Sequence, residues 1–244
     1  MTDAPTTLPP ALLDALSTLL GPRGLVTDPA DMEPFLSDWR GLYHGASPAL
    51  LRPANTAELA AAMRLLGQAG VAVVPQGGNT SMVGGAMPDE SGRQVVLSLA
   101  RMNRIRDIDP VDMTMVAEAG VILKNAQDAA AEAGCLFPLS LSAEGSATIG
   151  GVLATNAGGN NTVRYGNARD LLMGIEVVLP DGSVIEGLRR LRKDNTGFAL
   201  RQLFAGSEGT LGIITAAVLR LFPRPRTTAL ALCAMADEDA ALAL

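Results

Sequence analysis

The chain of 244 residues is poor in the side chains that build disulfide frameworks and metal clusters. It has 2 cysteines, Cys135 and Cys233, and 1 histidine, His44. Two cysteines exclude a disulfide framework and a four-cysteine zinc site, and one histidine excludes a multi-histidine cluster within this chain. We therefore expect no metal site in residues 1–244, and we expect both cysteines to be small buried residues.

Aromatic residues and positive charge are also scarce. Aromatics make up 3% of the chain, which argues against a base-stacking surface for single-stranded nucleic acid. Lys and Arg number 19 against 25 Asp and Glu, a net charge of −6, so nothing attracts the chain to nucleic acid or an anionic membrane in general. No apolar run is long enough for a membrane helix, and the N-terminal MTDAPTTLPP lacks the pattern of a secretory signal peptide. We expect a cytoplasmic protein with no nucleic-acid partner.

Glycine, by contrast, is abundant, with 26 residues. No two glycines are separated by a single residue, so the G-x-G-x-x-G fingerprint of Rossmann folds is absent. Neither lysine follows a glycine, which excludes a Walker A loop. A nucleotide bound by this chain must therefore be held by another arrangement.

The hydrophobic pattern mixes helices and strands without regular alternation, and apolar residues at 48% are enough for a core. Helices are predicted over 10–20, 28–36, 55–70 and 121–133, strands over 49–53, 71–75, 94–99, 104–109, 113–119 and 209–222, and a hairpin over 171–187. This order predicts an α+β fold with two small sheets that divide near residue 110. A further strand over 227–235 and the first turns of a helix over 237–244 follow, so we expect the N-terminal part of a longer protein.

The first of three glycine-rich segments, residues 75–85, directly follows a predicted strand. Gly77 and Gly78 lack Cβ atoms, so backbone N–H groups can close on an anion, and Asn79, Thr80 and Ser81 add side-chain donors. Such a loop suits a pyrophosphate that no lysine neutralises. The alternative is an ordinary turn that joins two strands.

The second segment, residues 138–166, holds small and hydroxyl residues at most positions. Ser146 and Thr148 can donate to phosphate or ribose oxygens, and Gly150-Gly151 would let a helix start close to a flat ligand. The alternative is a long surface loop. In the third segment, residues 205–215, missing side chains leave a slot in which an adenine could lie, the alternative being a bulged start of a strand.

Five stretches together resemble a known family: VVPQGGNTSMVGG (73–85), ATIGGVLATNAGG (147–159), RYGN (164–167), RKDNTGF (192–198) and LFAGSEGTLGIIT (203–215). They are similar to the FAD-binding domain of the vanillyl-alcohol-oxidase (PCMH-type) flavoproteins. Within that group they resemble the FAD-linked D-2-hydroxyacid dehydrogenases, which include D-lactate dehydrogenase, the glycolate oxidase FAD subunit and, most similar, D-2-hydroxyglutarate dehydrogenase. The resemblance covers roughly residues 50–225.

The resemblance implies a two-lobed α+β fold that holds an extended FAD between its lobes. It divides the chain into an N-terminal helical segment (1–46), a first lobe (47–110), a second lobe (111–226) and the start of a substrate or cap domain (227–244). The implied reaction is oxidation of a small D-2-hydroxy acid by hydride transfer to flavin N5. The implied partners are that substrate, an electron acceptor such as a quinone or electron-transfer flavoprotein, and a second copy or a partner subunit.

The resemblance also assigns cofactor-binding residues. Around the pyrophosphate it places Pro75, Gln76, Gly77, Gly78, Asn79, Thr80, Ser81, Gly84 and Gly85. Along the ribityl chain and isoalloxazine ring it places Gly145, Ser146, Thr148, Ile149, Gly150, Gly151, Thr155, Asn156, Ala157 and Gly158. At the adenine end it places Glu208, Gly209, Ile213 and Ile214. It identifies no general base, so the catalytic residues stay unknown.

The chain departs from the family pattern in three ways. The first loop has no histidine and His44 lies outside it, so we expect non-covalent FAD. Phe198 stands where the family usually has an aromatic residue with a hydroxyl. The metal ligands of relatives follow the FAD domain, so a divalent metal would belong only to a missing C-terminal part. Two alternatives remain: a non-catalytic FAD-binding subunit or fragment that needs a partner chain, and an anion-binding module without flavin.

Two basic clusters accompany these motifs. Arg101, Arg104 and Arg106 are expected to form a solvated strand edge. The run Arg189, Arg190, Arg192 and Lys193 is expected either to face an acidic substrate or redox partner, or to be a solvated loop.

Overall fold

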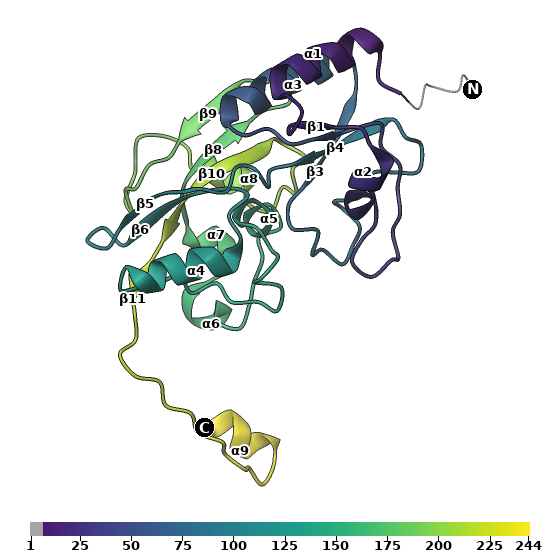
Figure 1. Ribbon diagram of the computed structural model, residues 1–244. Helices are drawn as coiled ribbons and strands as arrows, with labels where there is room; N and C mark the ends of the chain where they lie inside the picture. Colours follow the sequence, from purple (N-terminus) through teal and green to yellow (C-terminus); the bar gives the residue numbers. More distant parts are fainter. Residues whose placement is uncertain (1–6) are drawn as a thin grey trace.

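The computed structural model describes residues 7–244 and forms two main sheets with helices around them (Figure 1). The helices are α1 (Pro10–Leu20), α2 (Pro29–Leu36), α3 (Thr56–Gln68), α4 (Leu123–Glu132), α5 (Ile149–Ala154), α6 (Thr162–Tyr165), α7 (Ala168–Leu171), α8 (Arg201–Phe204) and α9 (Glu238–Ala243). A minor antiparallel pair joins β7 (Cys135–Leu136) to β11 (Phe222–Pro223). None of the helices formed by residues 7–244 is both long and apolar enough to cross a membrane.

The first sheet has the order β1 (Leu25–Val26), β2 (Leu50–Leu51), β4 (Gln94–Ser98), β3 (Ala72–Gln76). β4 lies parallel to both β2 and β3, whereas β1 is antiparallel to β2. The chain passes from β2 to β3 through α3, so these elements form a β-α-β crossover, which the sequence pattern did not predict.

Helix α3 begins where the sequence predicts it. The Asn55 side chain accepts the Glu58 N–H at 2.8 Å, and the Glu58 carboxylate accepts the Ala54 N–H at 2.7 Å. Asn55 and Glu58 therefore supply acceptors for N–H groups that the helix cannot pair itself. Leu59 and Leu66 on the buried face are fully inaccessible, and the helix packs against α1.

The second sheet has the order β5 (Ile105–Asp109), β6 (Thr114–Glu118), β10 (Ile213–Arg220), β8 (Leu172–Val178), β9 (Val184–Gly187). All neighbours are antiparallel, and β10 is the central strand. Because β5 pairs with β6, the predicted division of the sheets near residue 110 is one strand too late. The α+β class is confirmed.

One continuous apolar core joins the two sheets. It includes Leu59 from α3, Leu97 from β4, Leu123 from α4, Ile149 from α5 and Leu219 from β10. The lobe ranges 47–110 and 111–226 stay predictions, and residues 1–6 of the predicted segment 1–46 lie outside the described residues.

The predicted strand over 227–235 is wrong, because these residues have no regular structure and are exposed to solvent. Figure 1 shows the segment running away from both sheets, so it has no strand to pair with. The helix predicted after it is α9, which the Asp237 side chain caps through the Ala240 N–H at 2.8 Å. Cys233, expected to be buried, is exposed here, whereas Cys135 is buried.

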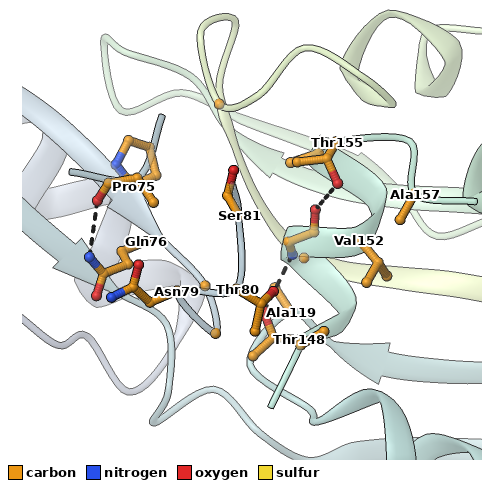
Figure 2. Close-up of a pocket in the computed structure, with 18 of the residues that line it drawn as sticks. Pro75, Gln76, Asn79, Thr80, Ser81, Ala119, Thr148, Val152, Thr155 and Ala157 are labelled. Carbon is orange, nitrogen blue, oxygen red and sulfur yellow. Dashed lines mark hydrogen bonds between the residues drawn. The ribbon is translucent and has the colours of Figure 1, made fainter. Parts of the chain in front are cut away.

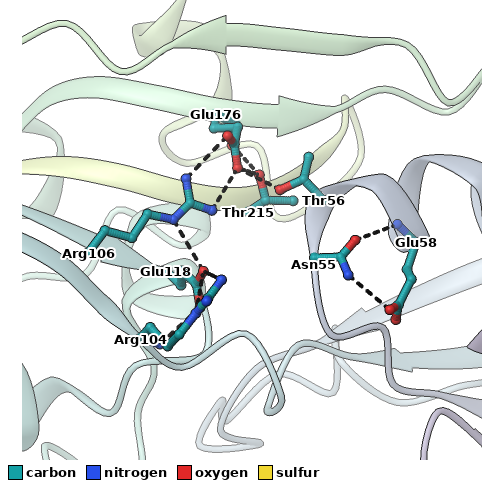
Figure 3. Close-up of polar contacts among 8 residues, drawn as sticks. All are labelled: Asn55, Thr56, Glu58, Arg104, Arg106, Glu118, Glu176 and Thr215. Atoms are coloured by element: carbon teal, nitrogen blue, oxygen red, sulfur yellow. Dashed lines mark hydrogen bonds and ion pairs between the residues drawn. The ribbon is translucent and has the colours of Figure 1, made fainter.

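A buried polar network lies across the second sheet (Figure 3). Arg106 bridges two carboxylates, with Nε 3.2 Å from Glu118 Oε1 and Nη2 3.2 Å from Glu176 Oε1. Arg104 lies 2.9 Å from Glu118, and the hydroxyl groups of Thr56 and Thr215 each donate to Glu176 at 2.7 Å. Thr56 belongs to α3, so the network also ties the helix to the second sheet.

This network corrects the expectation of a solvated edge at Arg101, Arg104 and Arg106. The Arg106 side chain is only 30% exposed and Glu118 is fully buried, while Arg101 donates to the Arg52 carbonyl at 2.7 Å. Only Arg104 keeps most of its side chain, 72%, in solvent. The partners lie too far apart in the sequence for local pattern to reveal them.

The network predicts a loss of stability in acid. Burial alone would raise the pKa of Glu176, but hydrogen bonds from Arg106, Thr56 and Thr215 outweigh it and lower that pKa below its ordinary value. A carboxylate with a lowered folded-state pKa stabilises the fold above its unfolded pKa of about 4.3, and this contribution is lost as the pH falls through the folded value.

We therefore expect Glu176→Gln to be less stable than the unchanged protein at pH 7. The gap in the free energy of unfolding should shrink as the pH is lowered below about 4, as the Glu176 carboxylate becomes protonated. Urea denaturation of both proteins at a series of pH values measures the gap. A gap that is independent of pH would contradict the assignment of a lowered pKa to Glu176.

Candidate functional site

A cavity of about 360 Å³ lies where the two sheets meet α5. The strand β3 and the loop after it form one wall, α5 and the chain before it form a second, and residues 208–214 before and within β10 form a third. Figure 2 shows Thr80 and Ser81 of the loop facing Thr148 and Thr155 at the two ends of α5. Three segments far apart in the sequence therefore enclose one space.

Most of the residues predicted to bind the cofactor line this cavity. They are Pro75, Gln76, Gly77, Gly78, Asn79, Thr80, Ser81, Gly85, Thr148, Gly150, Gly151, Thr155, Ala157, Glu208, Gly209, Ile213 and Ile214. The structure thus brings the three glycine-rich segments together, as a single extended ligand would require. The roles assigned to individual residues stay predictions.

Six predicted residues do not line the cavity: Gly84, Gly145, Ser146, Ile149, Asn156 and Gly158. Gly84 lies against the Tyr43 ring, and Ile149 is fully buried in the core. The Asn156 side chain accepts the Arg169 N–H at 3.0 Å. The side chains of Ile149 and Asn156 are therefore engaged by the core and by Arg169, away from the cavity.

Ala147 and Gly212 also line the cavity and lie within the stretches 146–151 and 208–214 that the resemblance assigns to the cofactor. Eight lining residues escaped the sequence analysis: Ala86, Leu99, Ala119, Leu141, Ser142, Ala143, Val152 and Ala154. A usable signal existed for Val152, which lies four residues after Thr148, about one helical turn, and directly follows the glycines at which a helix was expected to start. Ala119 and Leu99 follow buried strands and carry no chemical signature, so only the fold places them at the cavity.

The loop 77–81 packs directly on the chain before α5. A Cβ atom on Gly78 would lie 1.9 Å from the Ser146 carbonyl oxygen, and one on Gly77 would lie 2.7 Å from Thr148 Oγ1. The two segments therefore meet only because both positions lack a side chain.

The loop offers backbone donors to a ligand. Among the described residues, no protein acceptor is recorded for the backbone N–H groups of 77–81. Asn79 has a left-handed backbone, with φ of 50°, which bends the loop so that successive N–H groups can converge. Consecutive unpaired N–H groups in such a turn form a concave anion site.

The cavity is nearly free of charge. Of the described residues that line it, Glu208 alone has an ionisable side chain. Glu208 has φ of 53°, and its Oε2 lies 3.5 Å from where a Cβ atom on Gly85 would be. Its N–H donates to the Ala154 carbonyl at 2.9 Å, which holds the turn against α5. An anion here would be held by backbone groups and not by a cation.

The basic run 189–193 does not line the cavity, nor do Asn195, Thr196 and Phe198. Arg189 Nη1 lies 2.9 Å from Asp194 Oδ2, and Arg190 pairs with Asp107. Hydrogen bonds from Thr196 and then Arg189 hold the pKa of Asp194 well below its usual range. Part of this positive charge is thus neutralised by neighbouring carboxylates.

Comparison with known proteins identifies related families. The sequence model of one family, described as FAD binding domain, matches residues 47–187. Among solved structures, an alkyldihydroxyacetonephosphate synthase superposes with a TM-score of 0.81 at 25% identity, over 93% of this chain and 42% of that one.

Curated relatives share more of the sequence. The chain is 47% identical over 208 residues to the mitochondrial D-2-hydroxyglutarate dehydrogenase of Bos taurus, which covers 84% of this chain and 38% of the relative. It is 41% identical over 221 residues to the mitochondrial D-2-hydroxyglutarate dehydrogenase of Arabidopsis thaliana, and the match covers 90% of this chain and 39% of that relative. A D-2-hydroxyglutarate–pyruvate transhydrogenase of Saccharomyces cerevisiae is 42% identical over 200 residues, and the match covers 81% of this chain and 40% of that relative. The chain thus spans about two fifths of the length of these relatives.

These comparisons overturn one expectation. A cytoplasmic location is wrong, because the relatives from Bos taurus, Rattus norvegicus and Arabidopsis thaliana are named as mitochondrial. The expectation was based on the absence of a secretory signal and of apolar spans, and neither absence distinguishes one compartment from another.

Proposed function

The chain belongs to the FAD binding domain family, and on this basis we propose that its cavity holds one FAD non-covalently, as the flavin part of an enzyme that oxidises a D-2-hydroxy acid. Its fold is the PCMH-type FAD-binding fold that the sequence predicts. The relatives' names support the substrate class.

The observation that carries the proposal is the row of backbone N–H groups over 77–81, for which no acceptor is recorded within residues 7–244. A pyrophosphate needs several donors close together, and glycines let the backbone approach it. No lysine or arginine lines the cavity among the described residues, so the loop itself must hold the negative charge. The residues present therefore fit a dinucleotide with a pyrophosphate at its centre.

The other two walls fit the two ends of an FAD. Thr148, Gly151 and Thr155 present a surface with few side-chain atoms, which suits a flat ring and its ribityl chain. The carboxylate of Glu208 can only accept hydrogen bonds when ionised, so it suits ribose hydroxyls or an adenine amino group and repels phosphate. We place the adenosine at Glu208 and the ring at α5.

The residues that line the cavity support non-covalent binding of FAD. Among the described residues that line the cavity none is a histidine or cysteine. The single His44 lies with Tyr43 and Gly84 in a separate surface groove.

When bound, the flavin supplies the hydride acceptor at N5, while the protein supplies binding and orientation. Residues 77–81 would hold the pyrophosphate and α5 would hold the ring. Besides Glu208, no ionisable lining residue of the described chain could take the proton of a substrate hydroxyl. A quinone or an electron-transfer flavoprotein would then reoxidise the flavin.

Because Glu208 is the only ionisable residue among the described residues that line the cavity, a second candidate function is also favoured. In it, the chain is a non-catalytic FAD-binding protein that works only with a partner. In that case this chain binds FAD, and the partner provides the general base and the substrate pocket. Both candidates share the cofactor and differ in what the isolated chain can do with a substrate.

The cofactor is tested by purifying the protein and recording its visible spectrum before and after acid precipitation. We expect a flavin spectrum, and we expect the pigment to remain in the supernatant and to be identified as FAD. Pigment in the pellet would overturn the non-covalent hold. A folded, colourless protein that takes up no added FAD would overturn the proposed site.

The two candidate functions are separated by adding D-2-hydroxyglutarate or D-lactate to the FAD-loaded chain without oxygen. Bleaching of the flavin absorbance would show that this chain holds the substrate site. If the flavin is bound but keeps its absorbance with both D-2-hydroxyglutarate and D-lactate, the result favours the second candidate, an FAD-binding chain that needs a partner.

A further inference from the structure

Residues 35–45, here called the clasp, comprise the last two residues of α2 and the chain that follows it. They lie against the loop 76–86, here called the glycine loop. The clasp belongs to the N-terminal segment that the sequence predicts to be helical, but its residues 37–45 contain no helix. None of the clasp residues lines the cavity.

The amide of Gln76 ties both ends of the glycine loop to the clasp. Its Nε2 donates to the Phe35 carbonyl and to the Ala86 carbonyl, each at 3.0 Å. Gln76 is only 3% exposed, so water does not compete for these bonds. One buried side chain therefore sets the distance between the start and the end of the loop.

Three more contacts run along the loop. The Asn79 side chain donates to the Ser37 carbonyl at 2.9 Å, and the Arg40 guanidinium donates to the Met82 carbonyl. The Tyr43 ring lies so close to Gly84 that a Cβ atom there would come within 2.9 Å of it. The clasp thus touches the beginning, the middle and the end of the glycine loop.

The glycine loop has little structure of its own. Among the described residues, its recorded internal hydrogen bond besides Gln76 to Ala86 joins Val83 N–H to Ser81 Oγ at 3.3 Å. The Gly84 carbonyl also accepts the N–H of Met87, the residue after the loop, at 3.0 Å. A glycine-rich segment loses much conformational freedom when it is ordered. Its shape must therefore come largely from its neighbours, which are the chain before α5 at Gly77 and Gly78 and the clasp along the rest of the loop.

Asp38 determines the shape of the clasp. Its Oδ1 accepts the N–H groups of Leu42 at 2.6 Å and Tyr43 at 2.7 Å, and its Oδ2 accepts the Arg40 N–H at 3.3 Å. The side chain is 2% exposed. Its backbone also closes the turn, since the Asp38 N–H donates to the Tyr43 carbonyl at 3.0 Å.

We propose that Asp38 is a positioning residue for FAD: it fixes the clasp, and the clasp holds the glycine loop in its binding shape before the cofactor arrives. A loop ordered in advance loses less entropy on binding, which raises affinity without any new contact. The proposal rests on the placement of the FAD pyrophosphate at residues 77–81. It gives a cofactor-related role to a residue outside the cavity.

The test compares Asp38→Ala with Asp109→Ala. Asp109 is the matched control, because its Oδ1 also accepts two backbone N–H groups in a turn, from Val111 at 2.9 Å and Asp112 at 3.0 Å, and it does not line the cavity. We expect Asp38→Ala to raise the Kd for FAD about tenfold or more, as lost preorganisation does, and Asp109→Ala to leave it unchanged. Flavin fluorescence measures the Kd.

Hydrogen exchange of the proteins without FAD separates positioning from general stability. Asp38→Ala should speed exchange at residues 35–45 and 76–86 and leave α3 and β10 unchanged. Asp38→Asn keeps an oxygen that can accept the Leu42 and Tyr43 N–H groups, so it should recover most of the affinity. An unchanged Kd in Asp38→Ala, with the unchanged protein binding FAD, would overturn the role of Asp38.

If Asp38→Ala does not fold, Arg40→Ala gives the answer, because this partly exposed side chain ties the clasp to Met82. It should raise the Kd and speed exchange around residues 82–84, and no change in either would overturn the proposal. If the unchanged protein binds no FAD at all, the proposed cofactor site fails, and the exchange result still shows whether Asp38 orders the glycine loop.

Discussion

Replacing Gly78 by alanine should weaken FAD binding about a hundredfold. The new Cβ atom would lie 1.9 Å from the Ser146 carbonyl oxygen, 2.8 Å from its carbon and 3.1 Å from Ala147 Cα. All three atoms belong to the backbone, so no side chain can rotate away and the loop must lift off the segment before α5. Overpacking of this kind costs about 1–3 kcal/mol, and each 1.4 kcal/mol is about tenfold in affinity.

Titration of the apoprotein with FAD measures this effect, and Gly145→Ala is its control. Gly145 belongs to the same segment, but a Cβ atom there meets nothing within 4 Å and the residue does not line the cavity. We expect this variant to bind FAD normally. Equal Kd values for Gly78→Ala and the unchanged protein would mean that the close approach of the loop does not contribute to the site.

Arg106→Met should lower the free energy of unfolding by about 3 kcal/mol, the lower end of the range for breaking a buried ion pair. The change leaves Glu176, which is 13% exposed, without a cation, and it leaves the fully buried Glu118 with Arg104 only. The melting temperature should fall by about 6–12 °C for a chain of this size.

Calorimetry or urea denaturation tests this value, and a second substitution tests its cause. Glu176→Gln in the Arg106→Met background removes the uncompensated charge but keeps an acceptor for Thr56 and Thr215. It should restore about half of the lost stability or more, since the buried unpaired charge is the main source of the loss. A double variant no more stable than Arg106→Met would assign the loss to packing of the arginine side chain.

Local elements of this fold are predictable from the sequence. The α3 capping box and the β8–β9 hairpin around Gly182 are encoded within a few neighbouring residues. The pairing of β5 with the second sheet, the parallel arrangement around β4 and the absence of a strand over 227–235 depend on which distant segments meet. Hydrophobic periodicity carries no information on that choice.

In the candidate site, too, residues in local motifs are predictable from the sequence, whereas residues brought in by long-range contacts are not. Gly77, Gly78 and Glu208 stand in motifs whose unusual composition reveals them. Ala119 and Leu141 line the same cavity but look like any core residue. The link from Asp38 through Arg40 to Met82 spans 42 residues between its last two members, and such a contact becomes visible only once the chain has folded.

The central place of β10 has a consequence for the order in which the fold can assemble. β6 and β8 never pair with each other, because residues 213–220 lie between them. During synthesis from the N-terminus, the β5–β6 and β8–β9 hairpins emerge first and each must wait with an open inner edge. Open edges invite pairing with other chains, and long-range strand pairing is slow. A growing chain is therefore most prone to aggregation just before β10 leaves the ribosome.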